Sequence, residues 1–184
     1  MQRIFIAFPL PADIVSEVEK IQQALKRHRP RAVVSWTKPE SFHVTLHFFE
    51  KIDERQMLSL QGMVEPIAAK HRPFVYHLGR LDGFPDFILP RVLTIRLKDN
   101  REDRIIYDEI TAELTKALIP FDQKAWTPHI TLGRIRSRPY TVSPNEITMP
   151  RLSWTVRQIE IIKSELYPTG SKHSLVARYP LAAE

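Results

Sequence analysis

Two tetrads of the sequence repeat the same residue types nearly half the chain apart. Residues 43–46 are His-Val-Thr-Leu, and residues 129–132 are His-Ile-Thr-Leu. Side chains alternate between the faces of a strand, so the histidine and the threonine of each tetrad share one face. The apolar residues face the other way, toward a core. The repeat predicts two equivalent strands that present two His/Thr pairs across one cleft.

Two imidazoles in one cleft can move protons at neutral pH, because an unperturbed imidazole titrates near pH 6.5. One histidine can take a proton from a nucleophile while the other gives a proton to a leaving oxygen at phosphorus. Such acid–base help contributes about 10²–10⁴-fold per group. Hydroxyls of Thr45 and Thr131 can donate to phosphate oxygens. One tetrad alone is ordinary strand sequence, but two copies favour His43 and His129 as a catalytic pair.

A metal site is the alternative use of these histidines. His43 and His47 have the i, i+4 spacing that binds zinc on a helix. The residues between and after them favour a strand, where this spacing is about 13 Å and too long for one ion. Neither tetrad contains Asp or Glu. We therefore expect no metal and no cofactor.

Composition excludes several other classes of protein. The 184 residues contain no cysteine, which removes disulfides, thiolate catalysis and iron–sulfur clusters. An apolar content of 43% fits a globular protein. No apolar run approaches the ~20 residues of a membrane span, and the N-terminus makes a poor signal peptide. We expect one cytoplasmic domain over residues 1–184. The net charge of +6 is compatible with a polyanionic partner.

The tetrads lie within a mixed pattern of strands and helices. Apolar spacing and capping residues predict helices over 11–27, from Asp53 through Ile67, and from Asn100 or Asp99 to just before Pro120. Strands are expected over 2–9, 32–37, 41–49, 74–81, 88–97, 129–136, 154–166 and 173–179. The Pro-rich stretch 137–151 is a candidate mobile loop. This order, mostly β-α-β-β, predicts an α+β protein.

The paired motifs resemble those of the two-histidine phosphoesterase superfamily. The closer resemblance is to bacterial and archaeal RNA 2′,3′-cyclic phosphodiesterases, historically called 2′-5′ RNA ligases. The segments RIFIAF (3–8), SWTKPESFHVTLHFFE (35–50), PRVL (90–93) and SELYPTG (164–170) are also similar to this family. The fold implied is α+β and bilobal, with two antiparallel β-sheets and flanking helices around a central cleft, related by a pseudo-twofold axis.

The family's extended motifs are His-x-Thr-x-x-Phe and His-x-Thr-x-x-Arg. They are met by His43, Thr45 and Phe48, and by His129, Thr131 and Arg134.

The resemblance implies a role for each of these residues. His43 would protonate the ribose O3′ leaving group, and His129 would be the general base on the attacking water. Arg134 would hold the phosphate, which suits its forked donors. Phe48 would stack on the terminal base, an interaction worth about 1–3 kcal/mol. The product would be a 2′-phosphomonoester.

Phe48 and Arg134 conflict with strict alternation, because each lies five residues after its histidine. In a regular strand they would point to the opposite face. A bulge or a strand end after each threonine would resolve the conflict. Gly133 favours a bulge in the second motif, whereas the first motif has no glycine.

The remaining histidines and basic residues have less definite predictions. We expect Trp36 in the core or the cleft wall, and His47 either in the cleft or on the surface. Four histidines are expected in helix ends or turns without a chemical role: His28, His71, His77 and His173. Six arginines either guide an RNA backbone or form a solvated surface: Arg3, Arg27, Arg29, Arg31, Arg136 and Arg138.

The leading hypothesis is a metal-independent phosphodiesterase that opens 2′,3′-cyclic phosphates at RNA ends and acts as a monomer. Three alternatives stay open. The same site could carry out reversible 2′-5′ ligation or hydrolyse a small cyclic nucleotide. The chain could also be a non-catalytic module that binds RNA ends, with no membrane partner in any of these cases.

Overall fold

The computed structural model describes residues 1–28, 33–86, 89–136, 147–167 and 170–183. The helices are α1 (Ala12–His28), α2 (Glu54–Lys70), α3 (Arg101–Lys116) and a short 3-10 helix, η1 (Pro39–Ser41). The strands are β1 (Gln2–Pro9), β2 (Val34–Trp36), β3 (His43–Ile52), β4 (Phe74–Phe84), β5 (Val92–Leu97), β6 (His129–Ile135), β7 (Ser153–Val156), β8 (Gln158–Tyr167) and β9 (Gly170–Pro180).

The predicted helices and strands are found, with differences at several ends: β4 continues to Phe84, β5 begins at Val92, and η1 was not expected. The strand expected over 154–166 is two strands, because the chain crosses at Arg157 from a pairing with β4 to a pairing with β1. The predicted loop 137–151 falls largely outside the described residues, and its described part forms no helix or strand.

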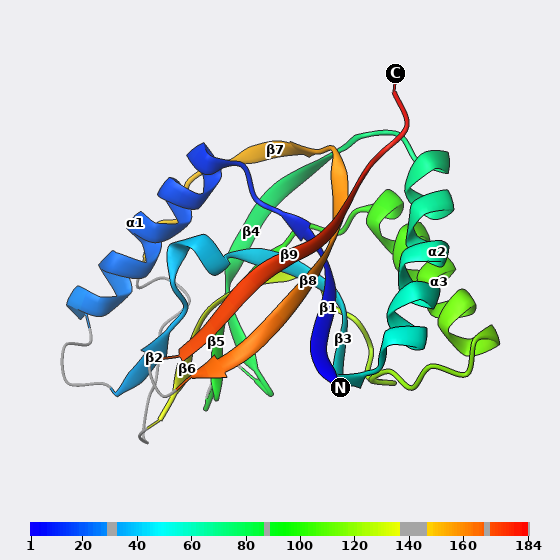
Figure 1. Ribbon diagram of the computed structural model, residues 1–184. Coiled ribbons are helices and arrows are strands. Elements are labelled where there is room, and N and C mark those ends of the chain that lie inside the picture. Colours follow the sequence, from blue (N-terminus) through cyan, green and yellow to red (C-terminus); the bar gives the residue numbers. More distant parts are fainter. Residues whose placement is uncertain (29–32, 87–88, 137–146, 168–169, 184) are drawn as a thin grey trace.

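Nine antiparallel strands form one curled sheet flanked by the helices (Figure 1). The strand order is β7-β4-β5-β6-β3-β1-β8-β9, with β2 paired to β6. Each half of this path starts at a histidine strand, β3 on one side and β6 on the other. The α+β class is therefore confirmed, and the two expected sheets are joined into one through the β3–β6 pair.

The β3–β6 pair brings the two tetrads together. Val44 and Ile130, the second residues of the tetrads, are partners in antiparallel register. Because the strands run in opposite directions, each histidine lies across from the threonine of the other tetrad. Facing residues of paired strands share a side of the sheet, so the register places both His/Thr pairs on one face.

Apolar side chains of the tetrads anchor this face from behind. Val44, Leu46, Ile130 and Leu132 are all buried in the core, whereas the histidines and threonines are only partly buried. The alternation predicted from the sequence is therefore confirmed in both tetrads.

The helices begin at side chains that cap their free N–H groups. Asp53 and Gln56 form a capping box at the start of α2. Asn100, rather than Asp99, caps α3 by accepting from the N–H groups of Glu102 and Asp103. Helices α2 and α3 lie side by side at one end of the molecule, and α1 lies at the other (Figure 1).

Both histidine strands contain a β-bulge directly after the threonine. In β3, Ala7 pairs with Thr45 but Ile6 pairs with His47, which leaves Leu46 as the extra residue.

In β6, Thr94 pairs with Thr131 but Leu93 pairs with Gly133, which leaves Leu132 as the extra residue. The predicted bulges are confirmed in both motifs, including the one without a glycine.

A buried glutamine supports the bulge of β6. Gln22 of α1 is 1% exposed, and its Nε2 donates to the Leu132 carbonyl at 2.9 Å and to the Thr37 carbonyl at 2.7 Å. A bulge withdraws backbone groups from the ladder, and buried carbonyls without donors are destabilising. Gln22 therefore holds the second histidine strand from behind.

We expect Gln22→Leu to lower the free energy of unfolding by about 1–3 kcal/mol, since it removes a buried donor from the Thr37 and Leu132 carbonyls, although the Leu132 carbonyl keeps the Thr37 N–H at 2.9 Å. Urea titration followed by circular dichroism measures this change. Gln23→Leu is the matched control, because Gln23 is exposed on the same helix and its change should stay within about 0.5 kcal/mol. Equal midpoints for the two variants would contradict the role given to Gln22.

Candidate active site

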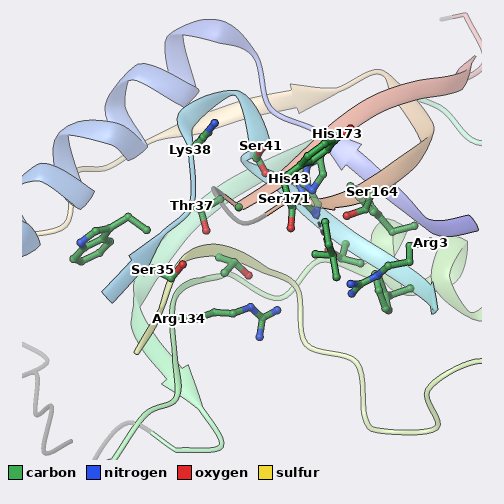
Figure 2. A pocket seen from close by; sticks show the side chains of 18 of the residues that line it. Arg3, Ser35, Thr37, Lys38, Ser41, His43, Arg134, Ser164, Ser171 and His173 are labelled. Carbon is green, nitrogen blue, oxygen red and sulfur yellow. Dashed lines mark hydrogen bonds between the residues drawn. The ribbon is translucent and has the colours of Figure 1, made fainter. Parts of the chain in front are cut away.

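A cavity of about 640 Å³ opens on the face that carries the tetrads (Figure 2). Five of the six residues predicted for the site line it: His43, Thr45 and Phe48 from β3, and Thr131 and Arg134 from β6. His129 does not line the cavity. It lies one register step away, across from Thr45, as the antiparallel pairing requires.

His43 is fixed at both of its ring nitrogens. Its Nδ1 lies 2.7 Å from the carbonyl oxygen of Ser41, so Nδ1 carries a hydrogen and donates. Its Nε2 lies 2.9 Å from the hydroxyl oxygen of Thr45. In the neutral ring Nε2 therefore accepts the hydroxyl hydrogen of Thr45. Nε2 is the nitrogen that can take up or release a proton. Phe5 stacks on the ring with centroids 4.4 Å apart.

His129 repeats this arrangement. Its Nδ1 donates to the carbonyl oxygen of Thr127 at 2.7 Å, again two residues upstream. Pro128 restricts Thr127 to an extended backbone, which presents that carbonyl to the ring. The edge of Phe84 packs on the ring at 4.8 Å. Both histidines are thus held in the tautomer that leaves Nε2 free to exchange a proton.

Burial makes both imidazoles weak bases. Desolvation lowers the pKa of His43 to about 4, opposed by the Ser41 carbonyl and assisted by the nearby rings of His173 and His129. Desolvation also lowers the pKa of His129, which the Thr127 carbonyl opposes and Arg134 reinforces. At neutral pH both rings are therefore uncharged until an anion binds.

The two bulges turn Phe48 and Arg134 into the cavity. Each bulge reverses which face the following side chains of its strand point to. Phe48 and Arg134 therefore lie on the same side of the sheet as the histidines. Phe48 is 37% exposed. The guanidinium carbon of Arg3 lies 5.1 Å from the Phe48 ring centre, so one face of that ring is covered by a cation.

His47 is a residue for which both sequence predictions are wrong. It is 3% exposed and lies neither in the cavity nor on the surface. Its ring stacks on Tyr107 of α3 with centroids 4.5 Å apart and an interplanar angle of 7°. The physical reason is the bulge at Leu46, which turns His47 to the opposite face from His43.

His173 is a cavity residue that the sequence analysis missed. It was expected in a turn, but it lies in β9, and its ring centre is 5.7 Å from that of His43. Figure 2 shows the two rings next to each other. The β8–β9 hairpin carries His173, and the pairing of β1 with both β8 and β3 brings it beside His43, so no local signal could have found it.

The other predicted residues are placed as follows. Trp36, Arg3 and Arg136 line the cavity wall, Arg27 is exposed at the end of α1, and His71 follows α2. His77 lies in β4 rather than in a turn. Arg29, Arg31 and Arg138 lie outside the described residues.

An aromatic stack of His47, Tyr107 and Trp126 connects the two motifs. Trp126, three residues before His129, stacks on Tyr107 with centroids 4.6 Å apart, and Tyr107 stacks in turn on His47. The indole Nε1 of Trp126 donates to the carbonyl oxygen of Thr45 at 2.8 Å, at the bulge of β3. A side chain that approaches from the second motif thus fixes the backbone of the first.

Trp126→Phe keeps an aromatic ring but removes this N–H. Because small displacements of catalytic groups slow reactions strongly, we expect kcat to fall about tenfold or more on the cyclic phosphate substrate that the sequence resemblance implies. KM should change less than kcat. Steady-state kinetics with folded protein, checked by circular dichroism, measures the effect.

Trp154→Phe is the matched control. The indole Nε1 of Trp154 is buried without a hydrogen-bond partner among the described residues, and Trp154 lies in β7 away from the cavity. Its kcat should equal that of the unchanged protein. A Trp126→Phe variant with unchanged kcat would refute the positioning role.

Neither a metal cluster nor a spanning helix is found in the part of the chain that the structure describes. None of its His, Cys, Asp and Glu side chains form a group of three or more that could hold a metal ion. None of its helices is long and apolar enough to cross a membrane. Proton transfer by the two imidazoles and anion binding by Arg134 are the chemistry that this face offers.

Comparisons with known proteins agree with this geometry. A family model described as LigT-like phosphoesterase matches residues 8–93. An RNA 2′,3′-cyclic phosphodiesterase of Bacillus subtilis (strain 168) is 31% identical over 130 residues, which cover 71% of this chain and 69% of the relative. One of Aquifex aeolicus (strain VF5) is 27% identical over 186 aligned positions, covering 97% of each protein.

Solved structures share the fold over the full length. The crystal structure of TT0787 of Thermus thermophilus superposes with a TM-score of 0.88 at 24% identity, covering 99% of each chain. Escherichia coli LigT complexed with 3′-AMP superposes with a TM-score of 0.84 at 18% identity, also covering 99% of each chain. With its two His-x-Thr strands, its fold and these relatives, the chain belongs to the LigT-like phosphoesterase family.

Proposed function

We propose that this protein hydrolyses the 2′,3′-cyclic phosphate end of RNA to a 2′-phosphomonoester without a metal ion. The observation that carries the proposal is the β3–β6 pairing, which brings His43 and His129 to one face beside Arg134. The substrate class is supported by relatives named RNA 2′,3′-cyclic phosphodiesterase and by the LigT structure with 3′-AMP.

The proposed reaction is an in-line displacement at phosphorus. Water attacks the cyclic phosphate while Nε2 of His129 takes one of its protons. The bond between phosphorus and O3′ breaks, and Nε2 of protonated His43 gives its proton to O3′. The 2′-ester bond stays, so the product carries a 2′-phosphate and a free 3′-hydroxyl. Arg134 and the hydroxyls of Thr45 and Thr131 bind the non-bridging oxygens.

The charge of the substrate favours protonation of His43. His43 is neutral before binding because burial lowers its pKa to about 4. A cyclic phosphate carries one negative charge, and an anion next to a buried imidazole favours the protonated form. Substrate binding and proton uptake by His43 are thus coupled, which makes the ring an acid only when a phosphate is present.

We propose one domain over residues 1–184 that acts as a monomer in the cytoplasm. Both proposed catalytic histidines belong to one chain and one sheet, so a second copy has nothing to add to the site. The cysteine-free composition suits a reducing compartment.

The direct test uses a defined oligoribonucleotide with a 2′,3′-cyclic phosphate end, with the product identified by ³¹P NMR. His43→Ala and His129→Ala should each lower kcat by about 10²–10⁴-fold, and excess EDTA should leave the rate unchanged. His77→Ala is the control, since His77 is exposed on β4 outside the cavity. Loss of turnover on chelation, or full activity of either variant, would refute the proposal.

Product analysis separates the alternatives. Joined product with a 5′-hydroxyl oligonucleotide would indicate 2′-5′ ligation at the same site. Salt-dependent RNA binding without any cleaved phosphate ester would indicate a binding module.

The pH dependence should reflect the buried imidazoles. The profile of kcat/KM reports the free enzyme, in which His129 must be neutral and His43 charged. Because burial lowers the pKa of both histidines below 6.5, we expect a bell whose maximum lies below pH 6.5. The maximum of kcat should lie at higher pH, since bound phosphate raises the pKa of His43. A kcat/KM maximum above about pH 7 would contradict these protonation states.

A further inference from the structure

A second hollow of about 500 Å³ continues from the catalytic cavity. The two share six residues: Lys38, Ser41, Tyr167, Gly170, Ser171 and His173. The first cavity alone, at about 640 Å³, has the size of a site for one small ligand. A ligand that fills both hollows also reaches Glu40 and Lys172, which do not line the first cavity.

The lining of the second hollow suits a nucleotide unit. Lys38 and Lys172 supply positive charge against the single carboxylate of Glu40, and neither lysine forms an ion pair among the described residues. Across the β8–β9 hairpin, Glu165 faces Lys172 but is paired with Lys163 at 3.1 Å.

An aromatic ring and two hydroxyls complete this lining. Tyr167 is 49% exposed, which leaves its ring accessible for stacking. The hydroxyls of Ser41 and Ser171 can donate to sugar or phosphate oxygens.

His173 stands where the two hollows meet. Its ring lies roughly at right angles to that of His43, and no hydrogen bond occupies its nitrogens among the described residues. Burial lowers the pKa of His173, so the ring is neutral and offers one donor and one acceptor. A group bound by His173 is a direct neighbour of a phosphate bound at His43.

We propose that the second hollow binds the nucleotide immediately 5′ to the cyclic phosphate end, with its phosphodiester at Lys172 and His173 and its base on Tyr167. This inference rests on the proposed function and names the substrate class: an oligonucleotide of two or more residues, rather than a cyclic mononucleotide.

The part of the cavity wall outside the second hollow is the competing path for the RNA chain. There Arg136 and Trp36 form the wall, and Lys26 lies 5.4 Å from the centre of the Trp36 ring. Because that ring already carries a cation on one face, it offers less stacking surface than Tyr167. The second hollow also extends the cavity on the side of Lys38, Lys172 and His173.

The test compares kcat/KM for a 2′,3′-cyclic mononucleotide with that for a 5′-hydroxyl dinucleotide that has the same cyclic end. The dinucleotide should be favoured about tenfold or more, the range expected for one stacked base and one phosphate contact. Lys172→Gln and Tyr167→Leu should each bring this ratio toward one. Lys51→Gln is the matched control and should keep the ratio, since Lys51 is exposed on β3 outside both hollows.

Salt dependence provides an independent readout. For the dinucleotide, the slope of log KM against log salt should be steeper by about 0.7 than for the mononucleotide, because one more phosphate is neutralised. Lys172→Gln should abolish the difference. A ratio of one in the unchanged protein, or a ratio that falls in Arg136→Gln but not in Lys172→Gln, would overturn the inference.

Failure of the proposed function would look different, because neither substrate would be hydrolysed. The inference is then tested by measuring the Kd of each substrate. Equal Kd values for the mononucleotide and the dinucleotide would overturn it, and a preference for the dinucleotide that Lys172→Gln removes would support it.

Discussion

One antiparallel contact in the middle of the sheet, between Val44 and Ile130, determines the geometry of the site. It joins the two halves of the sheet and sets each histidine across from the threonine of the other strand. Within the described residues, no other strand pair on the path β7 to β9 links the halves. A shift of this register by one residue would turn one His/Thr pair into the core and leave the other alone. The place of His43 and His129 on one face is thus a property of the strand pairing rather than of either strand.

The bulges determine which further side chains lie on the same face as the two histidines. Each rotates the strand after the threonine, so that Phe48 and Arg134 join the histidine face. The carbonyls near each bulge need donors from outside the ladder, and the chain provides them differently on the two sides. The amide of Gln22 serves β6, and the indole of Trp126 serves β3. The pseudo-symmetry of the motifs therefore does not extend to the side chains that support them.

The local sequence pattern was sufficient to predict which tetrad side chains share a face. Strand geometry alone places His43 and Thr45 on one face and Val44 on the other. The bulges were predictable because Phe48 and Arg134, both expected in the cleft, violated that alternation. The position of His47 could not be predicted, because it depends on which residue of β3 forms the bulge. His173 could not be predicted for another reason: its place beside His43 depends on β1, which pairs with β3 on one side and with the distant β8–β9 hairpin on the other.

The crossing at Arg157 has a consequence for how the chain folds. Apart from β2, the half of the sheet that contains β6 is built from strands within residues 74–156, whereas the half that contains β3 needs segments far apart in the sequence, because β1 pairs with β8. Such non-local pairing slows folding through its high contact order. During synthesis, the strands around His43 must wait for the last thirty or so residues to emerge. A nascent chain released early therefore exposes an unpaired β1 edge, which makes premature termination an aggregation hazard for this protein.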